Sequence, residues 1–259
     1  YMPNYIFLPN SRKNDLKNCE VLIEFDDHKI LELNKDNSYS LNKDLILLLG
    51  TSGSTGSKKF VRISYENIYH NTKNIVDFLK IRENHKTITT MPPFYTYGLS
   101  VINTHLFVGA SILVTNIRTI EKAFWKLMKD QKVCSFAGVP YFYEVLNKIK
   151  FDEFDLPDLK YFTQAGGALR KDLIEYFLAY SEKSKKEFVI MYGQTEATAR
   201  MTYLPYKMLR KKIGSVGIPI KEGKIYLVSD KSENSKKGEI IYEGKNVSLG
   251  YAKNFKDLI

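Results

Sequence analysis

The sequence has 259 residues, of which 44% are hydrophobic and 26% charged, with 15 glycines and 8 prolines. This composition excludes wholesale disorder, collagen-like repeats and a small disulfide-stapled fold, and the length suffices for one or two domains with a hydrophobic core. The net charge of +10 rests on 32 lysines spread along the chain and only seven arginines. Nucleic-acid recognition favours clustered arginine, so we expect a solvated basic surface and no nucleic-acid partner.

Nothing in the sequence predicts a membrane span. The longest apolar run, residues 45–49, is far shorter than the roughly 20 residues that a membrane-spanning helix needs. Residues 1–13 lack the basic start and apolar stretch of a secretory signal. Cys19 and Cys134 are far apart, without metal-like spacing, which favours ordinary thiols in a reducing compartment. We therefore expect a soluble, cytoplasmic protein without a zinc site.

The first elements follow from hydrophobic runs and turn residues. Residues 20–25 predict a strand within an otherwise weak first stretch. The apolar run at residues 45–49 predicts a strand covered on both faces. Residues 60–63 predict another short strand. Ser64 is expected to cap a helix that ends at about Lys80.

Short strands and helices alternate from there to about residue 192. The strands are expected at residues 87–90, 111–115, 133–137, 159–163 and 188–192. The helices between them are expected at residues 99–108, 120–132, 141–150 and 169–180. Repeated strand–helix units predict an α/β fold with a mainly parallel sheet and helices on both faces.

Helical periodicity ends at about Pro205. Residues 224–229 and 239–243 predict strands joined by a charged loop. We therefore expect an α/β part over residues 1–205, incomplete at its N-terminus, and a small β-barrel-like subdomain over residues 206–259, also incomplete.

The strongest chemical signal is the glycine- and hydroxyl-rich segment at residues 51–59, TSGSTGSKK. Glycines let backbone N–H groups turn towards an anion, hydroxyls add donors and lysines add charge, so the segment suits a polyphosphate. It lacks the spacing of the common P-loop. A flexible linker is the alternative, which the strands predicted on both sides disfavour. Residues 164–169 and 192–196 also follow predicted strands, where ligands of open α/β sheets bind.

Six motifs in this order resemble those of the superfamily of adenylate-forming enzymes, which includes acyl-CoA synthetases, peptide-synthetase adenylation domains and luciferases. They are TSGSTGSKK (51–59), MPPFYTYGL (91–99), QAGGAL (164–169), MYGQTE (191–196), GSVGIP (214–219), and GEI (238–240) running on to GY (250–251). The resemblance implies that ATP and a small carboxylic acid form an acyl-adenylate. The acyl group then passes to a thiol, either that of coenzyme A or that of an acyl carrier protein's pantetheine.

The resemblance also implies roles for individual residues. The β- and γ-phosphates would contact Thr51, Ser52, Gly53, Ser54, Thr55 and Gly56. The adenosine would be bound by Gly166, Gly167, Ala168, Tyr192, Gly193 and Gln194, with the Tyr192 ring stacked on the purine. The implied catalytic residues are Lys59 in the loop, Thr195 at the α-phosphate and Glu196 as a ligand of Mg²⁺, with Thr55 as a second metal ligand. Taken alone, a tyrosine before a glycine is an ordinary core aromatic, and a Thr-Glu pair is an ordinary helix start.

The acyl pocket is expected around Tyr95, Tyr97, Gly98, Val139 and Gly166. In amino-acid-activating relatives an aspartate of the Pro-Phe segment accepts the α-ammonium, since a buried cation needs a paired carboxylate. Tyr95 stands at that place, which favours an acid without an α-amino group. Val139 fits a pocket wall and a plain strand-to-helix turn equally well. The four histidines have no metal-like or triad-like spacing and are expected to be structural.

Two other functions stay open. An amino-acid-adenylating enzyme that loads a carrier protein would use the same nucleotide motifs. A non-catalytic nucleotide-binding remnant would keep the fold alone. The retained Lys59, Thr195 and Glu196 argue against the remnant, because a scaffold has no use for a charged metal ligand beside a phosphate loop.

The resemblance further implies a fragment of a longer ligase, without the family's C-terminal lid domain. The aspartate that binds the ribose and the lysine that drives adenylation would lie beyond Tyr251. We therefore expect the 259-residue chain by itself to bind ATP weakly and to adenylate little or nothing. Carboxylate-dependent ATP–pyrophosphate exchange measures this, and robust exchange by this chain alone would contradict the expectation.

Overall fold

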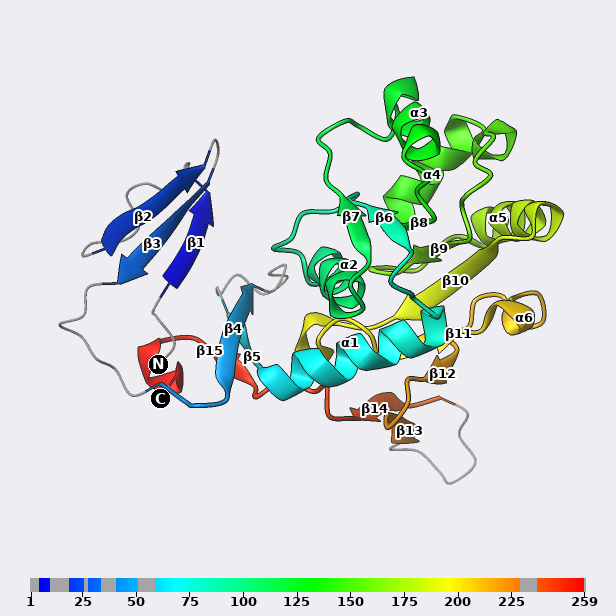
Figure 1. Cartoon of the computed structure of the whole chain (residues 1–259). Coiled ribbons are helices and arrows are strands. Elements are labelled where there is room, and N and C mark those ends of the chain that lie inside the picture. The colour runs from blue at the N-terminus through cyan, green and yellow to red at the C-terminus, as the bar shows by residue number, and fades with distance from the viewer. Residues whose placement is uncertain are drawn as a thin grey trace. The chain divides into compact units, whose positions relative to one another are not determined.

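The computed structural model describes residues 5–9, 19–25, 28–33, 41–50, 59–228 and 237–258 (Figure 1). The chain divides into two compact units, Tyr1–Asn42 with Ile259, and Lys43–Leu258. The first unit holds an antiparallel sheet with the strand order β1-β3-β2. Its strands are β1 (Tyr5–Pro9), β2 (Cys19–Phe25) and β3 (His28–Leu33). The strand expected at residues 20–25 is confirmed as β2.

The second unit is built on a seven-stranded sheet with the order β12-β11-β10-β9-β8-β6-β7. Its strands are β6 (Lys86–Ile88), β7 (Ser111–Leu113), β8 (Ser135–Gly138), β9 (Tyr161–Gln164), β10 (Glu187–Tyr192), β11 (Thr202–Leu204) and β12 (Ile218–Pro219). Strands β6 to β10 pair in parallel, whereas β11 and β12 are antiparallel additions at one edge. The predicted α/β fold with a mainly parallel sheet is therefore confirmed.

Helices cover both faces of this sheet (Figure 1). They are α1 (Tyr65–Leu79), α2 (Thr96–Phe107), α3 (Lys122–Asp130), α4 (Pro140–Lys148), α5 (Lys171–Ser184) and the short α6 (Tyr206–Leu209). Helices α3, α4 and α5 pack on one face, and α1 and α2 pack on the other. Single 3₁₀ turns are η2 (Phe151–Glu153), η3 (Thr195–Ala197) and η4 (Phe255–Leu258). None of the helices in the described ranges is long and apolar enough to cross a bilayer.

Helix α1 begins where the sequence predicts. The Ser64 hydroxyl accepts a hydrogen bond from the Asn67 backbone N–H at 3.1 Å, and the Asn67 side chain accepts one from the Ser64 N–H at 2.9 Å. This reciprocal pair is a capping box, which satisfies two otherwise unpaired donors. Helix α2 begins at Thr96, whereas the sequence predicts a start at Leu99. Its first turn, formed by Thr96, Tyr97 and Gly98, has no apolar helical stripe, so the sequence pattern does not reveal it.

Residues 45–49 do form a strand, but its side chains are less covered than predicted, because residues 45–48 are only half-buried. Strands β4 (Leu45–Gly50) and β5 (Phe60–Ser64) pair antiparallel and form a separate three-stranded sheet with β15 (Tyr251–Ala252). Strand β4 is the edge of that sheet, and only Leu49 in it is fully buried. An apolar run of five residues does not show whether a strand is central or at an edge.

The predicted C-terminal strands are present as β13 (Lys224–Val228) and β14 (Glu239–Glu243), which form an antiparallel pair. Their neighbours in sequence join other sheets, since β12 extends the large sheet and β15 pairs with β5. The domain division expected at residue 205 stays a prediction.

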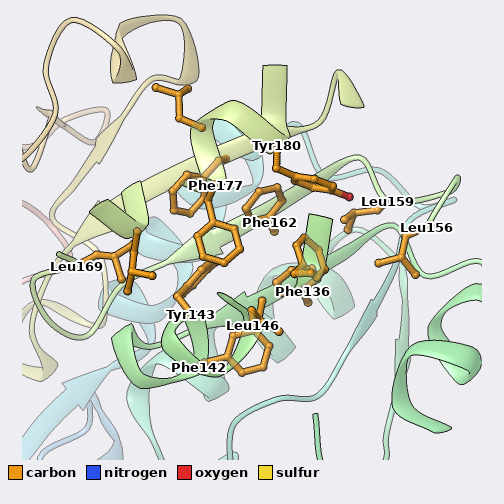
Figure 2. Packing of buried hydrophobic residues seen from close by; sticks show 14 of the residues in the cluster. Phe136, Phe142, Tyr143, Leu146, Leu156, Leu159, Phe162, Leu169, Phe177 and Tyr180 are labelled. Atoms are coloured by element: carbon orange, nitrogen blue, oxygen red, sulfur yellow. The ribbon is translucent and has the colours of Figure 1, made fainter. Parts of the chain in front are cut away.

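An aromatic cluster between the sheet and helices α3 to α5 forms the main core (Figure 2). Phe162 on β9 stacks between Phe136 on β8 and Phe188 on β10, with ring centroids 5.5 and 4.9 Å away. Tyr143 and Phe177 close over these rings from α4 and α5. All five side chains are at most 1% exposed. The stack therefore ties three adjacent parallel strands together.

Truncation of the central ring tests this core. We expect Phe162→Ala to lower the free energy of unfolding by about 3–5 kcal/mol, because it removes the ring's contacts with both stacked neighbours and leaves a cavity in the core. Tyr141→Ala, at a side chain 71% exposed on α4, is the control and should change it by less than about 0.5 kcal/mol. Urea denaturation followed through Trp125, the single tryptophan and a member of the same cluster, measures both. Similar losses in the two variants would contradict the assignment.

Candidate active site

A cavity of about 780 Å³ opens in the second unit where β9 and β10 end. Its walls come from segments far apart in sequence: the start of α2, the turn after β9, the end of β10 with the turn that follows it, and residues 214–216. Lys59 and Tyr251 line it as well. Ligands of open α/β sheets bind beyond the carboxyl ends of parallel strands, and the volume lies in the range of small-molecule sites.

The turn after β9 exposes backbone to the cavity. Gly166 has a φ of +83°, and a Cβ there would lie 2.6 Å from the Tyr95 hydroxyl and 3.1 Å from Val139 Cγ1. The Gln164 side chain donates a hydrogen bond to the Gly167 carbonyl at 2.8 Å and so braces the turn. Residues 166–168 are exposed and line the cavity, so a ligand can reach the peptide groups of this turn.

The turn after β10 is held from several sides. Gly193 passes so near the returning chain that a Cβ would lie 2.0 Å from the Ala199 carbonyl oxygen. The Asn246 side chain donates hydrogen bonds to the carbonyls of Ala197 and Arg200, at 2.7 and 3.0 Å. The Thr195 and Thr96 hydroxyl oxygens are 3.0 Å apart, which links the turn to the start of α2. The side chains of Thr195 and Glu196 are thus presented by a constrained turn.

Two opposite charges line the same cavity without pairing directly. Lys59 Nζ lies 5.3 Å from the centroid of the Tyr251 ring. The Tyr251 hydroxyl donates a hydrogen bond to Glu196 Oε1 at 2.8 Å, and this bond to the carboxylate raises the pKa of Tyr251. A lysine that can meet phosphate and a carboxylate that can meet a hard cation are the groups a nucleotide with Mg²⁺ requires.

The donor set fits magnesium bound together with a nucleotide. Within the described ranges no cluster of three or more His, Cys, Asp or Glu side chains can hold a metal ion. Magnesium usually binds through one or two carboxylates plus substrate phosphates and waters. Glu196 is the one carboxylate among the described residues that line the cavity, so it would be the protein ligand there.

Most of the predicted site residues meet at this cavity. Those that line it are Lys59, Tyr95, Tyr97, Gly166, Gly167, Ala168, Tyr192, Gly193, Gln194, Thr195 and Glu196. The predicted phosphate-loop residues, including the second metal ligand, lie outside the described residues: Thr51, Ser52, Gly53, Ser54, Thr55 and Gly56. The role of each residue in binding or catalysis stays a prediction.

Three residues of the expected acyl pocket differ in whether they line the cavity and in how much of the side chain is exposed to it. Gly98 does not line the cavity: a Cβ there would lie 2.4 Å from the Pro92 carbonyl oxygen, so this glycine lets α2 pack against the preceding loop. Val139 lies behind Gly166 and is also not part of the lining. Tyr97 lines it but is only 4% exposed, and its hydroxyl is bound to Thr163. Tyr95 is therefore the tyrosine whose polar end faces the turn at Gly166.

Sequence reasoning missed a buried cation beneath the site. Arg200 is 1% exposed, its guanidinium lies 4.2 Å from the centroid of the Tyr97 ring, and it donates a hydrogen bond to the Ser100 hydroxyl. Burial lowers the pKa of Arg200 to about 10. Its Nε has no hydrogen-bond partner among the described residues. The sequence offers one signal, a single arginine within the otherwise uncharged stretch ATARMTYL (197–204).

Residues 214–219 complete the wall of the cavity. They contain two glycines with nearly equal φ angles. Gly214 has a φ of +86° with open space around it, whereas Gly217 has a φ of +88° and a Cβ there would lie 2.0 Å from the Tyr203 carbonyl oxygen. The Thr202 hydroxyl donates a hydrogen bond to the Val216 carbonyl at 2.5 Å. Contact with β11 therefore carries Ser215 and Val216 to the cavity.

The chain belongs to the AMP-binding enzyme family, whose model matches residues 8–252. The resemblance to adenylate-forming enzymes is thereby confirmed. The chain is 29% identical to an oxalate–CoA ligase of Saccharomyces cerevisiae, over 84% of this chain and 40% of the relative. It is 28% identical to a 2-succinylbenzoate–CoA ligase of Oceanobacillus iheyensis, over 81% of this chain and 43% of the relative. The chain thus spans about two fifths of the length of the curated relatives it matches.

Solved structures show the same fold. An O-succinylbenzoate coenzyme A synthetase from Bacillus subtilis, in complex with ATP and magnesium ion, superposes with a TM-score of 0.72 at 20% identity, over 91% of this chain and 46% of that chain. VinN in complex with L-aspartate superposes with a TM-score of 0.71 at 25% identity, over 83% of this chain and 54% of that chain.

The two glycines of residues 214–219 provide a matched pair of substitutions. We expect Gly214→Ala to lower the free energy of unfolding by about 1–2 kcal/mol, because it adds only the strain of a left-handed backbone. Gly217→Ala should cost a further 1–3 kcal/mol or so, because its methyl group also meets the Tyr203 backbone. Urea denaturation of both variants measures the difference, and equal losses would show that the contact with β11 does not shape this wall.

Proposed function

We propose that the full-length protein activates a carboxylic acid with ATP and Mg²⁺ as an acyl-adenylate and then transfers the acyl group to the thiol of coenzyme A. The observation that carries the proposal is the arrangement of Lys59 and Glu196 around Tyr251 at one cavity, beside the two turns that end β9 and β10. Family membership and CoA ligases among the relatives support it.

In the first step an oxygen of the substrate carboxylate attacks the α-phosphorus of ATP, and pyrophosphate leaves. The Thr195 hydroxyl, oriented by Thr96, would donate a hydrogen bond to an α-phosphate oxygen, where negative charge develops. The Lys59 ammonium would stabilise the departing pyrophosphate together with residues 51–56. Magnesium, when held by Glu196, would neutralise phosphate charge.

The nucleoside would lie against the turn after β9. The Gly166, Gly167 and Ala168 backbone lines the cavity there and is exposed, so the adenine can approach the peptide groups. Tyr192, at the end of β10, would stack on the purine face. The acyl group would occupy the space next to Tyr95, whose hydroxyl lies at Gly166.

The cavity favours an acid without an α-amino group. Glu196 is the one carboxylate among the described lining residues, and Tyr251 already donates a hydrogen bond to it. No carboxylate of the described lining therefore stands at Tyr95 to pair with an α-ammonium, and an unpaired buried cation is costly.

Amino-acid activation with transfer to a carrier-protein pantetheine is the second candidate. The likeness to VinN, solved with L-aspartate, favours it. A non-catalytic remnant is disfavoured because Lys59, Thr195 and Glu196 converge on one cavity.

Substrate-dependent ATP–pyrophosphate exchange by the full-length protein, with a panel of carboxylic acids and amino acids, tests the proposal. We expect exchange with acids that lack an α-amino group, and acyl transfer to coenzyme A rather than to a carrier protein. Exchange restricted to amino acids would establish the second candidate instead.

Removal of the Glu196 carboxylate tests whether the protein is an enzyme or a non-catalytic nucleotide-binding remnant. Glu196→Ala should lower Mg²⁺-dependent exchange at least about 100-fold, because charge at the phosphates is no longer balanced. Glu243→Ala is the control, since Glu243 also accepts a hydrogen bond from a tyrosine but lies on the exposed β13–β14 pair. Unchanged exchange in Glu196→Ala would refute the assigned role.

A further inference from the structure

Tyr251 connects the two charged residues of the cavity. It lies on the two-residue strand β15, which pairs with β5 in the register Tyr251↔Val61 and Ala252↔Phe60. Lys59 directly precedes β5, and its ammonium lies over the Tyr251 ring. The same ring carries the hydroxyl that donates to Glu196 Oε1, a residue 55 positions away in sequence.

The backbone around Tyr251 is anchored on both sides. The Arg62 N–H donates to the Gly250 carbonyl, and the Leu249 N–H donates to the Arg62 carbonyl, each at 2.9 Å. The Ser248 N–H donates to the Glu196 carbonyl at 2.8 Å. Residues 248–251 are therefore bonded to the strand that follows Lys59 and to the turn that carries Glu196. This double attachment sets where the Tyr251 ring stands between them.

We propose that Tyr251 is a positioning residue, which orients the Glu196 carboxylate for a metal ion and keeps Lys59 from pairing with Glu196. This inference rests on the proposed function, because the metal is the Mg²⁺ that accompanies ATP. Tyr251 acts through its two neighbours and needs no contact with the substrate.

The hydrogen bond supports the first part of this role. It engages Oε1 of Glu196 and so limits rotation of the carboxylate, which directs Oε2 as the oxygen for the metal. Carboxylate ligands are commonly oriented by such outer hydrogen bonds, and loss of one typically weakens metal affinity about 10- to 100-fold.

The ring supports the second part. Lys59 and Glu196 both contact Tyr251, yet they are not among the ion pairs formed by the described residues. A direct pair would neutralise both charges before a nucleotide arrives. An aromatic face binds a cation through its quadrupole and leaves the net charge intact. The Lys59 ammonium thus stays able to meet phosphate, and the Glu196 carboxylate stays able to meet a metal.

Binding of Mn²⁺, used as a paramagnetic probe for Mg²⁺, tests the hydroxyl. The full-length protein, held in excess over ATP so that almost all of the nucleotide is bound, is titrated with Mn²⁺, and free Mn²⁺ is followed by electron paramagnetic resonance. Tyr251→Phe, which keeps the ring, should raise the dissociation constant for Mn²⁺ in the ATP complex about 10- to 100-fold. Affinity for ATP without metal should stay unchanged. A Mn²⁺ affinity within twofold of wild type would overturn the orienting role.

A matched control is available on the β13–β14 pair. The Tyr226 hydroxyl donates to Glu243 Oε1 at 2.6 Å, which is the same chemical pair on an exposed surface. Tyr226→Phe should therefore leave Mn²⁺ and ATP binding unchanged. A loss in Tyr226→Phe equal to that in Tyr251→Phe would show a general effect on stability and would also overturn the inference.

Removal of the ring tests the separation of charges. Tyr251→Leu should weaken metal-free ATP binding several-fold, because Lys59 can then pair with Glu196, whereas Tyr251→Phe should not. Adding Glu196→Gln to Tyr251→Leu removes the competing anion and should restore metal-free ATP binding. If Tyr251→Leu binds metal-free ATP as wild type does, the ring does not keep the charges apart.

Glu196→Ala distinguishes failure of this inference from failure of the proposed function. If Glu196→Ala weakens Mn²⁺ binding and Tyr251→Phe does not, Glu196 remains a metal ligand and only the role of Tyr251 is refuted. If neither variant weakens Mn²⁺ binding, the metal site of the proposed function is itself wrong.

Discussion

Stacking of Phe136, Phe162 and Phe188 across β8, β9 and β10 is the contact on which the site depends. Each ring points to the same face of the sheet, so the residues next to them, such as Ala137 and Val189, point to the opposite face against α1 and α2. The stack fixes the relative positions of three parallel strands. The hydrogen-bonded pairing of β9 with β10 sets the spacing of these strands, and the turns that line the cavity begin at their ends. By packing the paired strands against α4 and α5, the stack holds the sheet that carries both cavity walls.

Among the described residues of the site, charge is arranged without ordinary ion pairs. Lys59 lies over the ring of Tyr251, and buried Arg200 lies over the ring of Tyr97. Each cation therefore contacts an aromatic face in place of a carboxylate, which would neutralise its charge. Such an arrangement keeps a positive field near the cavity, which suits a polyphosphate ligand. It also explains why tyrosines are frequent in the lining, since each provides an apolar face and a polar end.

Family membership does not identify the acid that the proposed reaction would use. The curated relatives include ligases for oxalate and for 2-succinylbenzoate, which are two different acids. In the acyl pocket proposed for this chain, the Tyr95 hydroxyl lies at Gly166, while the Tyr97 hydroxyl is already bound to Thr163. Selectivity is therefore expected to depend on Tyr95 more than on Tyr97.

Local signals in the sequence determined the α/β alternation, the Ser64 cap of α1 and the six family motifs. These features depend on residues within a few positions of one another, where periodicity and turn chemistry act directly. The tertiary structure decided that β4 is an edge strand, that Gly98 serves packing, that Arg200 is buried, and that Tyr251 joins Lys59 to Glu196. The place of Arg200 under Tyr97 and the link through Tyr251 depend on residues 55 or more positions apart, and such contacts leave no periodic pattern in the chain. Gly98 meets Pro92 only a few positions earlier, but this contact belongs to a loop, where no periodic pattern marks it.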